Sequence, residues 1–345
     1  MNPQLLRRIL VSILSLTLVT ACESIQAEEL NVPKAQMTNG DSYGKPSAQA
    51  KEQITLGDSY GKLTDQGQSR TYYLYTPKSY NPDQPMPLVL VFHGDEGSGR
   101  SIADVTRFND LAEKNGFIVV YPDAINHTWS FKAKPNKKVD DVLFVNALIN
   151  HLEQVRNIDP QRIYATGFSK GAILTQALAC KLPDKITAFA SVAGALSARL
   201  IQKCQPQSPV SMLMINGTND KDVHYDGDDD LKQKGALVSV PQTVNFWETH
   251  NQCKSATPTQ VLAQATSSDG LKVKTAMFSG CMGGAEVVQL SVVDGGHFWP
   301  GGTTQDPQLK QVNNQLGFNA SQAIWDFFQH HGSSSEVSRP LPPSS

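Results

Sequence analysis

The chain has 345 residues, with 30 lysines and arginines, 32 aspartates and glutamates, and a formal net charge of -2 at pH 7. This length suits one large α/β domain, so a single catalytic unit is expected. Basic residues do not cluster in the body of the chain, and the sequence therefore lacks the positive surface that recognises phosphate backbones. Nucleic acid is excluded as the expected partner.

The first residues are typical of an export signal. Two arginines precede an apolar stretch at residues 9–19, which is too short to span a bilayer and runs into a threonine, an alanine and Cys22. Small residues before a cysteine resemble the lipobox of bacterial lipoproteins. We expect residues 1–22 to be a signal peptide and Cys22 to carry a lipid anchor. Because Glu23 is not the aspartate typical of inner-membrane retention, an outer-membrane or surface location is expected. The alternative is ordinary cleavage near Ala27.

The polar segment 23–67 is rich in Gly, Ser, Gln and Lys, which predicts a flexible tether. The catalytic domain is expected at 68–331, and the Ser- and Pro-rich residues 332–345 are expected to be disordered. The hexapeptide Gly-Asp-Ser-Tyr-Gly-Lys occurs twice, at 40–45 and 57–62. Two short copies are too few for a repeat architecture, so a local duplication in the tether is the interpretation.

Between the ends, short β-rich runs alternate with helical patterns, which is typical of a mostly parallel sheet covered on both faces. The predicted strands are Thr71–Thr76, Leu88–Phe92, Phe117–Tyr121, Arg162–Thr166, Ala188–Ala193, Val210–Asn216 and Val287–Val293. The predicted helices are Ser101–Lys114, one from Asp140 or Asp141 to Val155, Ser169–Lys181, Gln242–His250 and Gln322–His330. Several strands are continuous apolar runs, so the predicted class is α/β.

Within this pattern, Gly167-Phe168-Ser169-Lys170-Gly171 matches Gly-x-Ser-x-Gly between a predicted strand and a predicted helix. A serine on such a turn is held in strained geometry with its hydroxyl exposed, and the glycines remove side chains that would clash. The helix start also directs N–H groups toward developing negative charge. Ser169 is therefore the candidate nucleophile. The alternative is a serine that caps a helix beside two turn glycines.

A serine hydroxyl needs a base and a carboxylate that orients the base. In chains with the Gly-x-Ser-x-Gly motif, the acid follows the serine along the sequence and the histidine follows the acid. The loop after the predicted strand Val210–Asn216 contains Asp220, the preferred acid, and Asp222, its competitor, although either could be a turn residue. The loop after Val287–Val293 places His297 between glycine pairs, and His297 is the candidate base.

Acyl transfer also needs N–H donors for the oxyanion, each worth about 3 kcal/mol. One candidate is the backbone N–H of Lys170, after the nucleophile. The other is the N–H of Asp95 in the Gly-rich loop 93–99, which follows a predicted strand. A plain glycine-rich turn is the alternative for that loop.

Without Cys22, four cysteines remain, and four allow three pairings. Export permits disulfides. We expect Cys180–Cys204 and Cys253–Cys281, each closing a loop of roughly 25 residues and stabilising by about 3 kcal/mol. Buried free thiols are the alternative.

These features together resemble the esterase family of poly(3-hydroxybutyrate) depolymerases, feruloyl and acetylxylan esterases, and lipoprotein esterases of the same pattern. The resemblance extends from Arg70 to Trp299 and includes the segments 70–77, His93-Gly94, 121–123, 139–142, 159–164 running into Ser169, 178–180, 217–220, Cys281 and 295–302.

The resemblance implies an α/β-hydrolase fold and hydrolysis of carboxylic esters without a cofactor or metal. It implies Ser169, Asp220 and His297 as the triad, and it favours Asp220 over Asp222 because the family acid is the first aspartate of Gly-Thr-x-Asp. It also implies the sequential cysteine pairing. Trp129 falls where the family has an aromatic residue lining the cleft, with a buried core position as the alternative.

The sequence departs from the family pattern at Lys170, Ala172 and Asp95. The charge of Lys170 beside the nucleophile predicts a preference for esters that bear a carboxylate. The acidic residues 226–230 predict a solvated loop rather than a calcium site. The expected substrates are short-chain acyl, feruloyl or acetyl-polysaccharide, and hydroxyalkanoate esters. The alternative function is a non-catalytic surface lipoprotein that binds carbohydrate or polyester.

Overall fold

A computed structural model describes residues 54–130, 139–264 and 271–332. The expected signal peptide with Cys22, the first copy of the hexapeptide and the tail after Gly332 lie outside these residues. The strands are β1 Gly57–Asp65, β2 Gln68–Thr76, β3 Met86–Phe92, β4 Ile118–Pro122, β5 Ile158–Phe168, β6 Ala188–Val192, β7 Ser211–Gly217, β8 Ser255–Ala256, β9 Gln260–Gln264, β10 Lys272–Ser279 and β11 Val287–Val293. The α-helices are α1 Gly99–Thr106, α2 Phe108–Asn115, α3 Asp141–Val155, α4 Lys170–Lys181, α5 Ala198–Ile201, α6 Val240–His250, α7 Pro307–Gln315 and α8 Ala320–Gly332.

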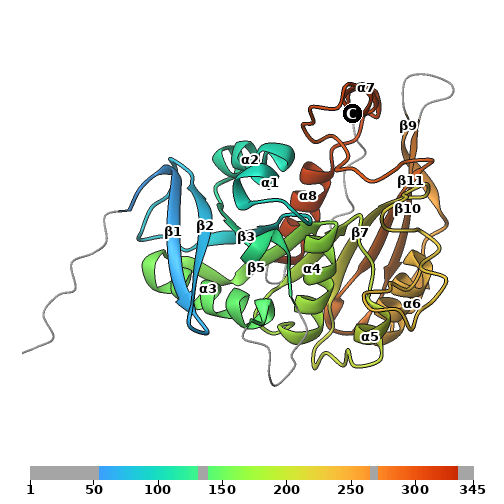
Figure 1. The fold of residues 1–345 in the computed structure, drawn as a ribbon, viewed down its shortest axis with the longest axis horizontal. Coiled ribbons are helices and arrows are strands. Elements are labelled where there is room, and N and C mark those ends of the chain that lie inside the picture. The colour runs from blue at the N-terminus through green and yellow to red at the C-terminus, as the bar shows by residue number, and fades with distance from the viewer. Residues whose placement is uncertain (1–53, 131–138, 265–270, 333–345) are drawn as a thin grey trace, which may run out of the picture. The chain divides into compact units, whose positions relative to one another are not determined.

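The strands form one mixed sheet in the order β1-β2-β4-β3-β5-β6-β7-β11-β10-β8, with β9 paired to β10 (Figure 1). The central strands β4, β3, β5, β6, β7 and β11 are parallel, and the strands at both edges are antiparallel. All seven predicted strands are present. Within the described ranges, no helix combines the length and apolar character needed to cross a membrane.

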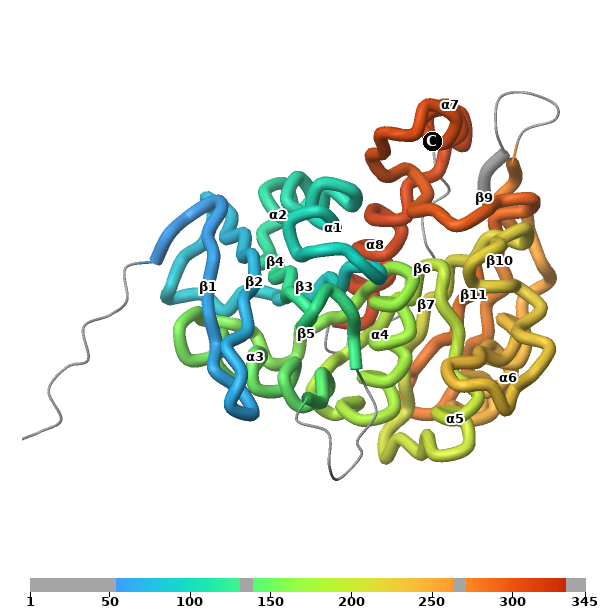
Figure 2. The backbone as a smooth tube through the Cα atoms, viewed as in Figure 1, coloured from blue at the N-terminus to red at the C-terminus, as the bar shows by residue number. Residues whose placement is uncertain are grey.

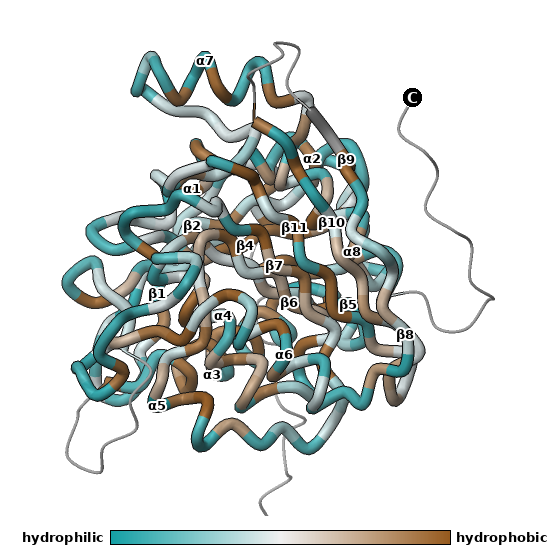
Figure 3. Tube along the Cα trace, turned by 90° about the vertical axis from the view of Figure 1, so that its right-hand side faces the viewer, coloured by the Kyte–Doolittle hydropathy of each residue, from teal (hydrophilic) through white to brown (hydrophobic). Residues whose placement is uncertain are grey.

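Two hydrophobic cores lie on the two faces of this sheet, because the parallel strands alternate their apolar side chains between the faces. Leu88 and Leu90 of β3 pack with residues of α3, α4 and α6. Val89 and Val91 of the same strand pack with residues of α1, α2 and α8. The central strands are accordingly the most hydrophobic part of the trace in Figure 3. These layers confirm the predicted α/β class.

The first helical region differs from the prediction. The expected helix Ser101–Lys114 is two helices, α1 and α2, which meet at Arg107 with a φ of 55°. No glycine or proline marks this break, and the apolar spacing continues through it. Ser98 caps α1 through the N–H of Ser101, so the helix also begins two residues earlier than expected.

The expected tether 23–67 is too long, because residues 57–65 form β1. This strand pairs along its length with β2 and lies at the edge of the sheet (Figure 2). Its side chains alternate between half-buried and exposed, and Leu63 packs against the core. An edge strand with one solvated face carries many polar residues, and its composition therefore resembles that of a linker.

Both predicted disulfides are present, Cys180–Cys204 and Cys253–Cys281. The first joins α4 to the segment after α5, and the second joins the end of α6 to the end of β10. The alternative of free thiols is wrong.

Candidate active site

Ser169 lies between β5 and α4, where its backbone adopts φ 55° and ψ -117°. This conformation is strained for a residue other than glycine. The Ser169 N–H donates to the carbonyl of Val192 on β6 over 2.9 Å, and the Ser169 carbonyl accepts from the N–H groups of Ala172 and Ile173. The neighbouring strand and the first turn of α4 therefore hold the strained serine in place.

The two glycines of the motif are required by close backbone approach. A Cβ at Gly167 would overlap the carbonyl of Gly171, and a Cβ at Gly171 would overlap the carbonyl oxygens of Phe92 and His93. The first turn of α4 thus lies directly against the ends of β5 and β3. Any larger side chain at either position would displace the turn that carries Ser169.

The loops after β7 and β11 are joined by backbone contacts. The N–H of Thr218 donates to the carbonyl of Val292, and the N–H of Asn219 donates to the carbonyl of Gly295 over 2.8 Å. Thr218 Oγ1 accepts from the N–H of Asp294. These bonds bring the loop that contains Asp220 against the loop that contains His297.

Asp220 Oδ2 and His297 Nδ1 are 2.8 Å apart, and the two side chains are 2% and 17% exposed. Asp220 Oδ1 accepts the N–H groups of Asp222 and Val223. Burial acts to raise the pKa of Asp220, but the hydrogen bonds from His297 and these two N–H groups outweigh it and hold the pKa below its ordinary value. Asp220 is therefore an ionised carboxylate on the imidazole, while the side chain of Asp222 is exposed.

Ser169 and His297 lie at the same edge of the sheet. The ring of Phe168, the residue before Ser169, is 4.8 Å from the His297 ring between centroids. On the other side, a Cβ at Gly94 would be 3.4 Å from the Ser169 Cβ. The carboxyl ends of β3, β5, β7 and β11 thus bring together the nucleophile candidate, the loop 93–99 and the Asp220–His297 pair.

Comparisons with known proteins give the class to which this chain is similar. Residues 70–201 match the family described as Esterase PHB depolymerase. The chain is 29% identical to NocK of Nocardia uniformis subsp. tsuyamanensis, whose name designates an esterase, over 69% of this chain and 72% of NocK. It is 28% identical to feruloyl esterase C of Emericella nidulans, over 76% of this chain and 85% of that enzyme.

This chain belongs to the Esterase PHB depolymerase family. It is a carboxylic ester hydrolase, and its substrate is an ester. An acetyl xylan esterase from Aspergillus awamori has the same α/β-hydrolase fold, with a TM-score of 0.52 at 14% identity over 75% of this chain and all of that one.

In this esterase, the loop 93–99 is held by a buried histidine that the sequence analysis did not single out. His93 is 1% exposed, its Nδ1 is 2.6 Å from the carbonyl oxygen of Gly94, and its Nε2 accepts the N–H of Ala124. Burial lowers the pKa of His93, so the ring is neutral and donates from Nδ1. The signal for this role was the His-Gly pair directly after a buried strand.

Trp129 does not line a cleft. It is 3% exposed, its Nε1 donates to the carbonyl of His93 over 2.8 Å, and its ring packs against the rings of His93 and Phe92. The buried-core alternative therefore holds. Trp129 supports the loop that leads to Asp95, which is itself exposed.

One group of possible metal ligands occurs among the described residues, namely Asp220, Asp222 and His297, with one atom of each within 4.8 Å of the others. A structural zinc site has four ligands. Here two of the three groups already bond to each other, so the geometry does not call for a metal. In the acidic segment 226–230, the carboxylate of Asp230 accepts the backbone N–H of Lys232, and that of Asp228 accepts the backbone N–H of Leu237.

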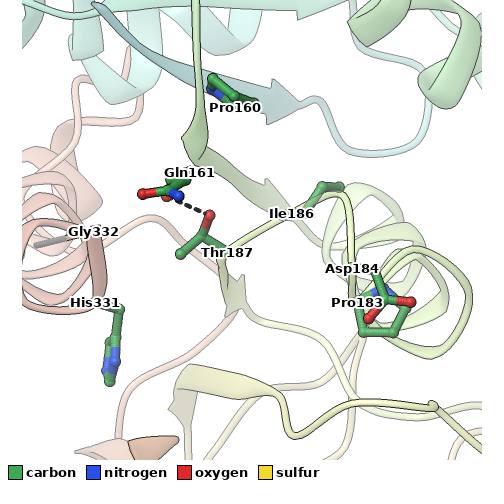
Figure 4. A pocket seen from close by; sticks show the side chains of 8 residues that line it. All are labelled: Pro160, Gln161, Pro183, Asp184, Ile186, Thr187, His331 and Gly332. Atoms are coloured by element: carbon green, nitrogen blue, oxygen red, sulfur yellow. Dashed lines mark hydrogen bonds between the residues drawn. The ribbon is translucent and has the colours of Figure 1, made fainter. Parts of the chain in front are cut away.

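A cavity of about 400 Å³ lies at the opposite end of β5. It is lined by Pro160, Gln161, Pro183, Asp184, Ile186, Thr187, His331 and Gly332 (Figure 4). Nine residues of extended strand separate Pro160 from Ser169, or roughly 30 Å at the rise of a β-strand. This cavity is remote from the candidate site around Ser169 and His297.

Proposed function

We propose that this esterase uses a Ser-His-Asp acyl-enzyme mechanism. Ser169 Oγ attacks the ester carbonyl while His297 Nε2 takes its proton, and His297 then protonates the leaving alcohol. Water attacks the acyl-enzyme by the reverse sequence and releases the acid. The observation that carries the proposal is the 2.8 Å contact of buried, ionised Asp220 with His297 Nδ1, which leaves Nε2 as the free acceptor.

The backbone N–H groups of Lys170 and Asp95 are the proposed oxyanion donors. Lys170 is the first residue of α4, where an N–H has no intrahelical acceptor. Asp95 follows Gly94, whose backbone lies against Ser169. Two such donors would stabilise the tetrahedral intermediate by about 3 kcal/mol each.

The proposed natural substrates are feruloyl or acetyl esters of polysaccharide, with short-chain acyl and hydroxyalkanoate esters as further members of the class. The names of the relatives support this choice. The two disulfides are typical of an oxidising compartment, and this supports export. We propose a lipid anchor at Cys22 on the strength of the sequence alone.

Hydrolysis of p-nitrophenyl acetate tests the mechanism. Replacement of Ser169 by Ala should reduce kcat by roughly 10⁴- to 10⁶-fold. The matched control is Ser69→Ala, an exposed serine on β2, which should keep full activity. Activity that persists in Ser169→Ala would refute the nucleophile. An inactive wild-type protein would favour the alternative, a surface lipoprotein that only binds carbohydrate or polyester.

Lys170 supports a finer proposal about the acyl group. Its side chain is half-buried beside the nucleophile, and within the described ranges it takes part in no ion pair. The wild type should prefer esters that carry a carboxylate near the acyl group. Its ratio of kcat/KM for anionic over neutral esters should be about fivefold larger than that of Lys170→Met. Equal discrimination between anionic and neutral esters by the two proteins would remove this role.

A further inference from the structure

The second copy of the repeated hexapeptide has no part in the proposed chemistry, yet it presents an exposed aromatic ring. Residues 57–62 begin β1, whose exposed face carries Asp58, Tyr60 and Lys62. Tyr60 is 70% exposed, the largest exposure among the large hydrophobic side chains of the described part of the chain. Tyrosine is enriched at binding interfaces because its ring is apolar and its hydroxyl is polar, so Tyr60 is a candidate contact residue for a ligand.

The sheet register places Tyr60 at the catalytic edge. Tyr60 pairs with Tyr73 of β2, and Tyr73 pairs with Tyr121, the residue before the last of β4. Since β4, β3 and β5 are parallel, the carboxyl end of β4 faces the same way as the end of β5 before Ser169. Four strand spacings separate β1 from β5, or roughly 19 Å. Tyr60 and the nucleophile thus lie on one rim, at a distance that a short oligosaccharide can span.

Polar side chains that suit sugar hydroxyls surround this ring. The Tyr60 ring centroid is 5.3 Å from that of Tyr73, and the exposed Asp58 and Arg100 side chains are paired at 3.5 Å. The Tyr73 hydroxyl donates to Asp58 Oδ1 and accepts from Asn109 Nδ2, both over 2.7 Å. Burial raises the pKa of Tyr73, which keeps this hydroxyl protonated. The surroundings of Tyr60 are therefore fixed before any ligand arrives.

Arg100 links this patch to the loop beside Ser169. It lies in the first turn of α1, which begins directly after the loop 93–99, and its guanidinium is 5.1 Å from the centre of the Tyr73 ring. Arg100 therefore connects the patch of Asp58, Tyr60, Arg100 and Asn109 to the loop that contains Asp95.

We propose that these four residues form a carbohydrate subsite for the polysaccharide that carries the ester. The C–H face of a sugar would stack on Tyr60, and its hydroxyls would bond to the carboxylate of Asp58 and the guanidinium of Arg100. A polyester offers no hydrogen-bond donor for the acceptor positions of Asp58 that the Tyr73 hydroxyl and Arg100 leave open, whereas a sugar hydroxyl does. Addition of a foreign strand to β1 is opposed by the charges of Asp58 and Lys62 on the edge strand. The proposal rests on the proposed function, because it takes the ester to be borne by a glycan.

Kinetics on two substrates test the subsite. With feruloylated xylo-oligosaccharides of six sugars, Tyr60→Ala should raise KM about five- to tenfold with kcat unchanged, while hydrolysis of p-nitrophenyl acetate stays at the wild-type rate. Tyr60→Phe keeps the ring and should keep the wild-type KM. Leu143→Ala, an exposed apolar residue on α3, is the control for general loss of surface contact. Arg100→Met should raise KM for the long substrate alone, which gives a second variant at the same subsite.

Binding of unesterified xylohexaose to Ser169→Ala, measured by calorimetry, separates the subsite from the chemistry. The double variant with Tyr60→Ala should lose that binding. Equal KM values of wild type and Tyr60→Ala on the long ester would overturn the subsite. It would also be overturned if Tyr60→Ala lost binding to polyhydroxybutyrate granules but kept binding to xylohexaose. Persistent ester hydrolysis by Ser169→Ala would instead refute the proposed nucleophile and leave the binding result intact.

Discussion

The two ends of β5 have opposite properties. At its carboxyl end, backbone groups approach so closely that only glycine fits at positions 167 and 171, and Ser169 is held in a strained conformation. At its amino end, the residues around Gln161 and Thr187 border an open cavity and make ordinary hydrogen bonds (Figure 4). This cavity thus lies away from the candidate catalytic residues. In this esterase, the candidate site is marked by strain, burial and a charged pair rather than by empty volume.

The reason lies in what each end must do. A nucleophile has to be held in one geometry relative to its base, and the dense packing around Ser169 and the bonded loops after β7 and β11 supply that rigidity. The amino end has no such task, and its loops can remain loosely packed. This difference predicts that substitutions at the two ends of one strand have effects of very different size.

The largest effect after loss of the nucleophile is expected at Asp220. Asp220→Asn keeps the shape but removes the charge that orients His297, and kcat should fall about 10⁴-fold. Asp222→Asn is the matched control, because it removes an exposed carboxylate from the same loop, and it should cost less than about fivefold. Measurements of kcat with p-nitrophenyl acetate decide between them. A larger loss in Asp222→Asn would transfer the role of acid to that residue.

The glycines give the next largest effect. Ala at position 171 would overlap the carbonyls of Phe92 and His93, and the displaced turn should cost about 100-fold in activity. Overpacking should also reduce the free energy of unfolding by about 1–3 kcal/mol. Gly296→Ala is the control on the same rim, since a Cβ there meets nothing within 4 Å. Similar activities for the two variants would show that the rim is not tightly packed.

Much of this catalytic rim could be predicted from the sequence, because its motifs are local. The continuous apolar strands predict a sheet buried on both faces, and each site residue follows such a strand directly. The motifs that make Ser169, Asp220 and His297 the candidates are read without long-range information. The cysteine pairing could also be predicted, since each disulfide joins two cysteines that are consecutive in the sequence.

The errors lie where tertiary contacts override local composition. The strand β1 has the polar composition of a linker, and only its pairing with β2 identifies it. The break between α1 and α2 occurs at Arg107 without a glycine. The family resemblance predicted that Trp129 lines the cleft. Its indole N–H instead donates to the carbonyl of His93 inside the core. Strand β10 was missed because its half-buried face lacks an apolar run, and strand β9 was missed because its side chains at 260–262 are exposed.

A smaller difference should appear in the pH dependence of stability. The pKa of Asp220 is lowered in the folded protein, so its ionised form stabilises the fold. That contribution is present above the ordinary carboxyl range near pH 4 and is lost as the pH falls through the lowered value. The Tm of wild type should therefore exceed that of Asp220→Asn at pH 6, with the difference shrinking below pH 4. A Tm difference that stays constant from pH 6 to pH 2.5 would contradict the lowered pKa.

The smallest effect is expected at the amino end of β5. Thr187 Oγ1 donates to the carbonyl of Gln161 at an exposed position, and Thr187→Val removes only this bond. Stability should change by about 0.5–1 kcal/mol, and kcat/KM should stay within about twofold of wild type. The same holds for Gln161→Ala, which alters the wall of the cavity without touching the strand ladder. A tenfold loss of ester hydrolysis in either variant, with Tm unchanged, would mean that the cavity communicates with Ser169 along β5. Both ends of β5 would then contribute to ester hydrolysis, and they would differ only in their distance from Ser169.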